Sequence, residues 1–370
     1  MNPGNYNLKA KIYKGKTGLD EIFSGWKSIN EQNENSDLSH LPEWYVSIFD
    51  SFKNSDQDFR FVVIYRDNQI EMILPVKKAV KKINGIKLKS LELPFTGHFV
   101  FRDLVTRSDE VKPYLFEYLW KFITESDELK FDIFIGFNIH RNSNFFQFIK
   151  SSKLKTKFLK EESSIDFIIL NKYENIHSAV SGNFRHNLKK NKKKISKKGD
   201  LIFEGAISRR AVNSLFGRFV DLEASGWKGK NGTSTAIKCR PELMEFYKNM
   251  MINCNGSSEF DIQIASINNT DVAGQLGIRY KNTFYTLKIG YNEHYSKFGP
   301  GNLLQEYVIS RFREDGKTDF INLMSGFKWH KLWTKDYVQT YNAVVFQNSI
   351  KGMFVYFLQL SKNYAKKLLM

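Results

Sequence analysis

Two glycines that flank a proline carry the clearest chemical signal in this chain. The motif Gly299-Pro300-Gly301 follows an apolar run at residues 283–290 and precedes a helix-like segment at residues 302–312. Proline fits the first turn of a helix, and glycine lets backbone amides approach a ligand closely. Those amides and the helix dipole favour an anion, above all a phosphate. The segment therefore predicts a strand, a phosphate-binding turn and a helix.

A second apolar run at residues 319–323 follows this helix, and Gly316 is well placed to end it, so the whole segment predicts a β-α-β unit. The dinucleotide and P-loop patterns do not fit, because Leu304 stands where a third glycine is required and no Gly-Lys-Ser/Thr follows. The G-x-S-x-G and H-E-x-x-H motifs of hydrolases and metalloenzymes are also absent from the sequence.

The motif Ser296-Lys-Phe-Gly299-Pro-Gly301 resembles the turn with which GCN5-related N-acetyltransferases (GNATs) hold the pyrophosphate of coenzyme A. Ser296 stands where these enzymes usually have Gln or Arg. Three further segments occur in order along the chain, at residues 183–199, 226–229 and 287–293. Together they resemble the double-domain acetyltransferase family that includes sugar N-acyltransferases and polysaccharide-biosynthesis proteins, and that is distantly similar to the Fem aminoacyl transferases. The segment 324–333 departs from the family, since Trp329 and His330 replace a frequent Tyr-Lys pair and its Asp is absent.

Composition predicts a globular protein of two domains or one large one. The chain has 370 residues, of which 42% are hydrophobic, enough for a sizeable core. It has no run of 18 apolar residues, and residues 1–7 lack the features of a signal peptide, so we expect a cytoplasmic protein without membrane insertion. The two cysteines, Cys239 and Cys254, have no spacing typical of a disulfide framework or a metal site, and no metal is expected.

The formal net charge of +17 is concentrated in one segment. Residues 185–198 contain eight Lys or Arg and no acidic residue, and Leu188 and Ile195 would lie on one side of a helix there. A solvated surface helix is the simplest interpretation. Nucleic-acid-binding signatures and interleaved aromatic residues are missing, so no nucleic acid is expected as a partner. These charges could instead attract coenzyme A or a nucleotide sugar at low salt.

The first half of the chain resembles the second in the order of its elements. Predicted hairpins at residues 61–76 and 261–278 are each followed by a strand, a helix and a strand; in the first half these are residues 99–105, 113–123 and 132–136. In this alignment Lys112 and Tyr114 occupy the positions of Gly299 and Gly301. We therefore predict a tandem α/β fold with two GNAT-like mixed-sheet domains, residues 1–165 and 166–370, and a cleft between them. The first domain would bind the acceptor and lack a cofactor site.

Acyl transfer from a thioester to an amine needs a polarised carbonyl, a neutral amine and a proton for the departing thiolate. The resemblance implies that backbone groups of the strand at residues 283–290, including Leu287 and Ile289, would bind the pantetheine arm. It also implies that the amides of Gly299, Gly301 and Asn302 would hold the pyrophosphate. Lys228 is a further candidate for a phosphate contact.

Several side chains are candidates for catalysis or acceptor binding. Glu223 lies at the end of an amphipathic helix, and His330 titrates in a useful range, so either could be the general base. Tyr291 or Tyr295 could protonate the thiolate. Candidate acceptor contacts are His98, Arg102, Asp103 and Trp227.

The sequence thus predicts an acyl-CoA-dependent N-acyltransferase that modifies a nucleotide-linked, dTDP-type dideoxyamino sugar for surface polysaccharide biosynthesis. Two alternatives stay open. A Fem-like enzyme would use aminoacyl-tRNA on the same fold, and a basic protein without catalytic activity would bind nucleic acid or anionic lipid.

Overall fold

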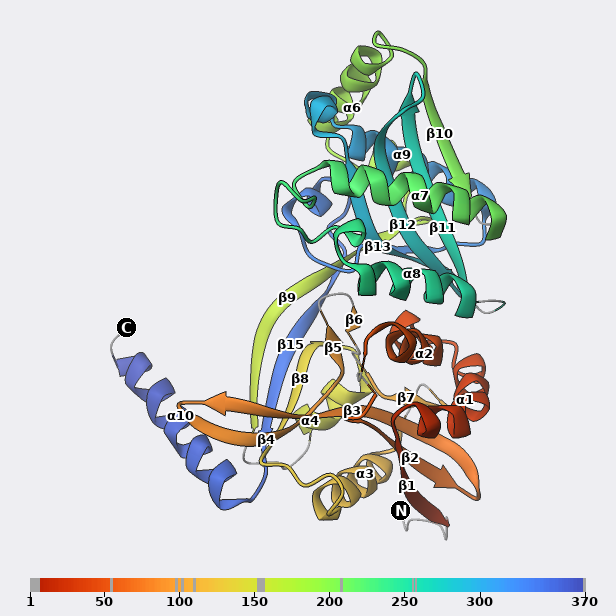
Figure 1. The fold of residues 1–370 in the computed structure, drawn as a ribbon. Helices are drawn as coiled ribbons and strands as arrows, with labels where there is room; N and C mark the ends of the chain where they lie inside the picture. Colours follow the sequence, from red (N-terminus) through yellow and green to blue (C-terminus); the bar gives the residue numbers. More distant parts are fainter. Residues whose placement is uncertain are drawn as a thin grey trace. The chain divides into compact units, whose positions relative to one another are not determined.

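The computed structural model describes most of the chain, namely residues 7–53, 56–96, 99–100, 103–108, 111–151, 157–206, 209–254, 256 and 258–368. The chain forms two compact units. The first comprises Met1–Phe49, Lys53–Ser163 and Gln339–Met370, and the second comprises Asp50–Phe52 and Ser164–Val338. Each unit contains β-strands of a mixed sheet with helices packed on it (Figure 1).

In the first unit, neighbouring strands follow the order β1 (Leu8–Lys14), β2 (Phe59–Arg66), β3 (Gln69–Ile83), β4 (Ile86–Glu92), β8 (Ile133–His140) and β15 (Tyr337–Phe346). Only β4 and β8 are parallel among these neighbours. Three short strands complete the described set: β5 (Phe95–Thr96) pairs with β6 (Phe99–Val100), and β7 (Val105–Thr106) pairs with β3.

Six helical segments accompany this sheet: α1 (Gly15–Gln32), η1 (Leu38–His40), α2 (Pro42–Ser51), α3 (Pro113–Glu125), α4 (Asn144–Ser151) and α10 (Ile350–Leu368). Trp26 of α1 packs against Tyr45 and Phe61, and its indole Nε1 donates to the carbonyl oxygen of His40 at 2.7 Å. On α10, Val355 belongs to a core cluster with Leu88, Ile133, Ile135 and Phe346. The C-terminal segment therefore completes the core of the first unit.

In the second unit, neighbouring strands follow the order β9 (Lys157–Ile169), β14 (Phe320–Asn322), β13 (Thr283–Tyr291), β12 (Thr270–Tyr280), β11 (Ser258–Ile267) and β10 (Leu201–Ala206). Its helical segments are α5 (Ile176–Ala179), α6 (Gly182–Ile195), α7 (Arg209–Ser225), η2 (Ile237–Cys239), α8 (Pro241–Asn253), η3 (Glu293–Phe298), α9 (Pro300–Asp315) and η4 (Lys328–Leu332). Helices α7 and α8 lie on one face of strands β11–β13, and α9 lies on the other (Figure 1).

The predicted α/β class and the β-α-β unit are confirmed. Helix α9 begins at Pro300 and ends before Gly316, whose φ of 63° fits a left-handed C-cap. Strand β13 is parallel to β14, as a helical connection between them requires. The basic segment forms α6, and its Leu188 and Ile195 are buried as predicted.

Both units share one topology, although the predicted strand at residues 99–105 was wrong. Of its described residues, only 99–100 and 105 are in strands, β6 and β7, and β4 is the strand that pairs in parallel with β8. Strand β3 extends to Ile83, and Asn84 and Gly85 then turn the chain with positive φ values, so β4 is its hairpin partner. As in the second unit, a helix with proline in its first turn, α3, connects the two parallel strands.

The sequence predicted a single domain boundary at residue 165, and the division of the structure into two units is different. The chain changes unit between Ser163 and Ser164, but Gln339–Met370 belong to the first unit. The physical reason is that β15 pairs with β8, and α10 contributes Val355 to the core beside Leu88.

A buried acidic residue fastens α9 to the sheet of the second unit. Asp261 of β11 is fully buried, and its Oδ1 accepts hydrogen bonds from Nη1 of Arg311 at 2.8 Å and from Nε2 of Gln263 at 2.7 Å. Arg279 of β12 lies between Asp261 and Asp315, with its Nη1 2.9 Å from Oδ2 of Asp315. Burial raises the pKa of Asp261, while Arg311 opposes that shift.

Replacing Asp261 with Ala should lower the free energy of unfolding by about 3–5 kcal/mol, because Arg311 then loses its buried partner. Urea unfolding of the full chain measures this change. Asp127→Ala is the control, since the Asp127 carboxylate is 95% exposed and, among the described residues, pairs with Lys130 alone; its effect should stay below about 0.5 kcal/mol. Equal effects of the two substitutions would contradict the anchoring role.

Candidate functional site

The parallel strands β13 and β14 pair at only three positions. Thr283, Phe284 and Tyr285 pair with Phe320, Ile321 and Asn322, and the pairing then stops. Beyond Asn322 the chain turns toward β9: the amide of Leu323 donates to the carbonyl oxygen of Asp166 at 3.0 Å, and Met324 has a φ of 59°. Within the described residues, no strand pairs with residues 286–291 on this side of β13. We call this stretch the free edge of β13.

A β-bulge lies where the free edge begins. Leu276 of β12 pairs with Lys288 and Gly277 pairs with Thr286, so Leu287 has no counterpart in the register. A bulge redirects the backbone groups of the extra residue and bends the strand locally. The Thr286 hydroxyl accepts a hydrogen bond from Nε2 of Gln275 at 2.8 Å, which fixes the side chain just before the bulge. Leu287 and Ile289, both predicted from the sequence, thus lie on the free edge.

The loop after α7 is tied to β13 through Glu223 and Lys228. The side chain of Glu223 is fully buried; its Oε2 accepts from the amide of Ile237 at 2.9 Å, and its Oε1 lies 3.3 Å from Nζ of Lys228. Nζ of Lys228 also donates to the carbonyl oxygen of Ile289 at 2.8 Å. Both carboxylate oxygens of Glu223 therefore have partners. Lys228 contacts the free edge through the carbonyl oxygen of Ile289.

Two aromatic side chains lie exposed where the loop reaches the end of β13. The amide of Trp227 donates to Oε1 of Glu293 at 2.9 Å, while its indole and the ring of Tyr291 face solvent. Gly226 lies so close to the strand that a Cβ placed on it would be 3.4 Å from the carbonyl oxygen of Tyr291. Burial lowers the pKa of Lys288 on the same strand.

The turn before α9 presents an open face at one glycine. Gly299 has a φ of 59°, and Gly301 is exposed, with no atom within 4 Å of the position its Cβ would take. The amides of Gly299 and Asn302 donate within the chain, to the carbonyl oxygens of Ser296 and Gly299. Of the three predicted amides, Gly301 alone has no such partner among the described residues. A phosphate would fit this open, positively polarised end of a 16-residue helix.

A residue of the segment that follows β14 holds the side chain of Asn302 in place. Its Oδ1 accepts a hydrogen bond from Nε1 of Trp333 at 3.2 Å, and Trp333 packs edge-on against Phe184 of α6 with ring centroids 5.0 Å apart. Helix α6 is also close to the turn, since Nδ2 of Asn191 lies 3.3 Å from the position a Cβ of Gly299 would take. The basic helix therefore borders the start of α9.

His330 is buried in a cluster around Asp166. Its Nδ1 lies 2.9 Å from the carbonyl oxygen of Ser325 and 3.2 Å from Oδ2 of Asp166, while Nζ of Lys331 lies 2.5 Å from Oδ1 of Asp166. Burial lowers the pKa of His330. Sequence reasoning missed Asp166; its signal was a single acidic residue inside an otherwise apolar run at residues 165–170.

Of the acceptor contacts predicted in the first domain, the structure describes only Asp103. His98 and Arg102 lie outside the described residues. The carboxylate of Asp103 caps α4, because its Oδ2 accepts from the amide of Asn144 at 2.9 Å and its Oδ1 from that of Phe145 at 2.8 Å. Burial raises the pKa of Asp103 to about 6.

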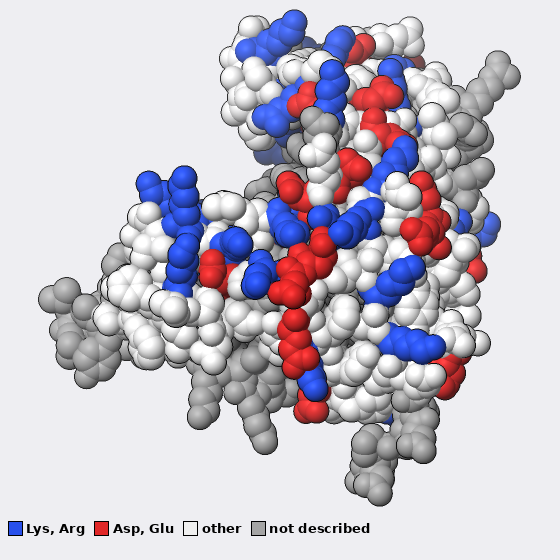
Figure 2. All heavy atoms as spheres, turned by 60° about the horizontal axis from the view of Figure 1, so that its bottom comes forward, with Lys and Arg blue, Asp and Glu red and all other residues white. Residues whose placement is uncertain are grey.

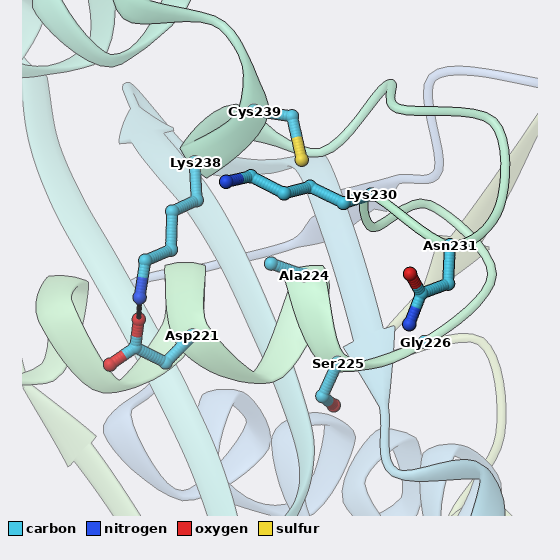
Figure 3. Close-up of a pocket in the computed structure, with 8 residues that line it drawn as sticks. All are labelled: Asp221, Ala224, Ser225, Gly226, Lys230, Asn231, Lys238 and Cys239. Carbon is cyan, nitrogen blue, oxygen red and sulfur yellow. Dashed lines mark hydrogen bonds and ion pairs between the residues drawn. The ribbon is translucent and has the colours of Figure 1, made fainter.

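A pocket of about 410 Å³ lies between the end of α7 and η2, as Figure 3 shows. Lys238 is ion-paired with Asp221 at its border. Nζ of Lys230 has no hydrogen bond or ion pair within the described part of the chain. The remaining lining residues are Ala224, Ser225, Gly226, Asn231 and Cys239. One lining residue, Gly226, lies close to Tyr291 at the end of β13.

Comparisons with known proteins agree with this geometry. Residues 182–331 match the family model of the acetyltransferase (GNAT) domain. No curated protein matches the chain in sequence.

Three solved structures share the fold over almost the whole chain. A conserved protein of unknown function from Bacteroides thetaiotaomicron has a TM-score of 0.55 at 14% identity and covers 87% of this chain and 97% of its own. FemX has a TM-score of 0.54 at 12% identity, with 91% and 98% covered. A tandem GNAT protein from the clavulanic acid biosynthesis pathway has a TM-score of 0.51 at 8% identity, with 92% and 99% covered. Residues 182–331 are therefore similar to a GNAT acetyltransferase domain, and the chain shares its fold with tandem GNAT and Fem-like structures.

Proposed function

We propose that the second unit binds an acyl-CoA and transfers the acyl group to an amine. The observation that carries this proposal is the combination of the free edge of β13 with the open glycine turn at the start of α9. An extended pantetheine arm can pair with strand backbone groups, and a pyrophosphate fits the amide of Gly301 and the helix dipole. The match of residues 182–331 to the GNAT domain supports the same assignment.

The reaction replaces a carbon–sulfur bond with a carbon–nitrogen bond: the amine nitrogen attacks the thioester carbonyl, the amine loses a proton and the thiolate gains one. Backbone N–H groups at the Leu287 bulge are available to stabilise the carbonyl oxygen as it gains charge. The exposed Tyr291 at the end of the free edge is our candidate for the proton donor to sulfur. The backbone groups of the bulge are held by the pairing of β12 with β13 before the substrates arrive, so positioning would supply much of the rate.

Neither Glu223 nor His330 is our candidate for the general base. Both are buried; both carboxylate oxygens of Glu223 have partners, and Nδ1 of His330 contacts Ser325 and Asp166. We assign Glu223 the task of holding the loop against β13, and His330 the task of fixing the segment after β14. The acceptor amine would then arrive neutral or lose its proton to water.

For the acceptor, we propose a nucleotide-linked amino sugar. Support comes from the pocket between the end of α7 and η2, where Lys230 offers an uncommitted cation, and from the net charge of +17. The first unit would hold no second coenzyme A site, because Lys112 and Tyr114 flank Pro113 where the second unit has glycines. One coenzyme A per chain is the expected stoichiometry.

Gly301→Val should raise the dissociation constant of coenzyme A by about tenfold or more, because a side chain there would meet the pyrophosphate. The protein itself has room for the substitution. Isothermal titration calorimetry with coenzyme A measures the change. Gly217→Val is a matched control, since Gly217 is also helical, exposed and free of contacts at its Cβ position. Equal affinities of the two variants would refute the assignment of the turn.

Glu223→Gln should keep most of the turnover, whereas Glu223→Ala should lower it by about tenfold. The amide of Gln retains an oxygen that can accept from Ile237, and Ala does not. Steady-state rates with acetyl-CoA and an amino sugar nucleotide distinguish the two roles of Glu223. A loss in Glu223→Gln as large as in Glu223→Ala, with an altered pH profile, would indicate a general base instead.

Lys230→Ala should raise the Michaelis constant for the nucleotide-linked acceptor about three- to tenfold and leave the affinity for coenzyme A unchanged. Lys248→Ala on α8 is the control, because Lys248 is also exposed but does not line the pocket. If Lys230→Ala weakens coenzyme A as strongly as the acceptor, the pocket does not belong to the acceptor.

A further inference from the structure

Helix α10 presents apolar side chains to solvent. Ile350 is 92% exposed, Phe354 57%, Phe357 58% and Leu360 37%. The spacing of residues 350, 354 and 357 places them on one side of the helix, with Leu360 one turn further. We call these four residues the outer stripe. The opposite side of α10 is already used, because Val355 is fully buried in the core of the first unit.

The outer stripe belongs to a helix that carries only positive charge. Residues 350–368 contain Lys351, Lys362, Lys366 and Lys367, and no Asp or Glu. Exposed helices of globular proteins usually combine both signs of charge. An apolar side together with lysines and no acid is typical of helices that lie in the interface of an anionic membrane.

The neighbouring hairpin adds further positive charge. Helix α10 contacts β4, and in the β3–β4 register Lys82 lies directly opposite Lys87, with the exposed Lys89 nearby. Neither Lys82 nor Lys87 has an ion pair among the described residues. Like charges directly opposite one another destabilise a sheet, and an external anion would offset this cost. In Figure 2, one of several groups of Lys and Arg lies at the left, the side on which α10 and this hairpin lie in Figure 1.

We propose that the outer stripe of α10 docks the protein on an anionic lipid surface. The aromatic and aliphatic side chains would enter the headgroup region, and Lys351 together with the lysines of the hairpin would contact lipid phosphates. A second copy of this chain fits the surface less well, because pairing two such helices would bring lysines together without acidic partners. Attachment would be peripheral: in the described residues, no helix is both long and apolar enough to cross a bilayer.

Vesicle co-sedimentation of the full chain tests this proposal. The probes are vesicles of phosphatidylcholine alone and of phosphatidylcholine mixed with phosphatidylglycerol. We expect binding to the anionic vesicles, weakened by salt, and little binding to the neutral ones. The double substitution Phe354→Glu and Phe357→Glu should reduce binding by about tenfold or more. Ile202→Glu with Ile252→Glu is the matched control, since both residues are similarly exposed but lie in the second unit; it should bind like the wild type.

Three results would overturn the proposal. The first is equal binding of the wild type to neutral and anionic vesicles. The second is equal binding of the two double variants to anionic vesicles. The third is a wild-type dimer in analytical ultracentrifugation that the Phe354→Glu, Phe357→Glu variant converts to a monomer, without vesicle binding in either form. Circular dichroism confirms that the variants keep the fold, and coenzyme A binding should be unchanged in both, so the result is independent of the proposed enzymatic function.

Discussion

The candidate site depends on one constraint: β13 and β14 pair at only three positions and then separate. Strands joined by a helix ordinarily continue side by side, but here Asp166 binds the chain that leaves β14. Its carbonyl oxygen accepts from Leu323, and its carboxylate contacts His330 and Lys331. A buried carboxylate with several partners is costly to displace. The open space beside β13 is thus maintained by the segment opposite it, not by β13 itself.

Buried acids recur wherever a helix or loop must be held relative to this edge. Asp261 fixes α9 through Arg311, and Glu223 fixes the loop after α7 through Ile237 and Lys228. Each such carboxylate loses hydration on folding, and directional hydrogen bonds compensate for that loss. Directional contacts define one geometry, whereas apolar packing tolerates several. Rigid support of this kind suits a site in which backbone groups, rather than mobile side chains, meet the ligand.

The ends of helices and their buried sides could be predicted from the sequence, because short-range rules determine them. Pro300 and Gly316 delimit α9 because proline and left-handed glycine have fixed conformational preferences, and Leu188 with Ile195 mark the buried side of α6 by helical spacing. Contacts between residues far apart in the sequence could not be predicted in this way. The partnership of Asp166 with His330 spans 164 residues, and the pairing of β15 with β8 spans about two hundred, and no local pattern encodes either. The strand at residues 99–105 failed for a related reason, since its composition favours β-structure but β4 takes the place beside β8.

The discontinuous first unit has a consequence for how the chain is made. A ribosome releases residues in order, so the segment Ser164–Val338 is complete before Gln339–Met370 emerge. Until then β8 lacks its neighbour β15, and Leu88 and Ile133 lack the cover of Val355. An unpaired edge and an uncovered apolar surface favour association with other chains. The first unit is therefore exposed to such association until synthesis ends, whereas Ser164–Val338 can fold early.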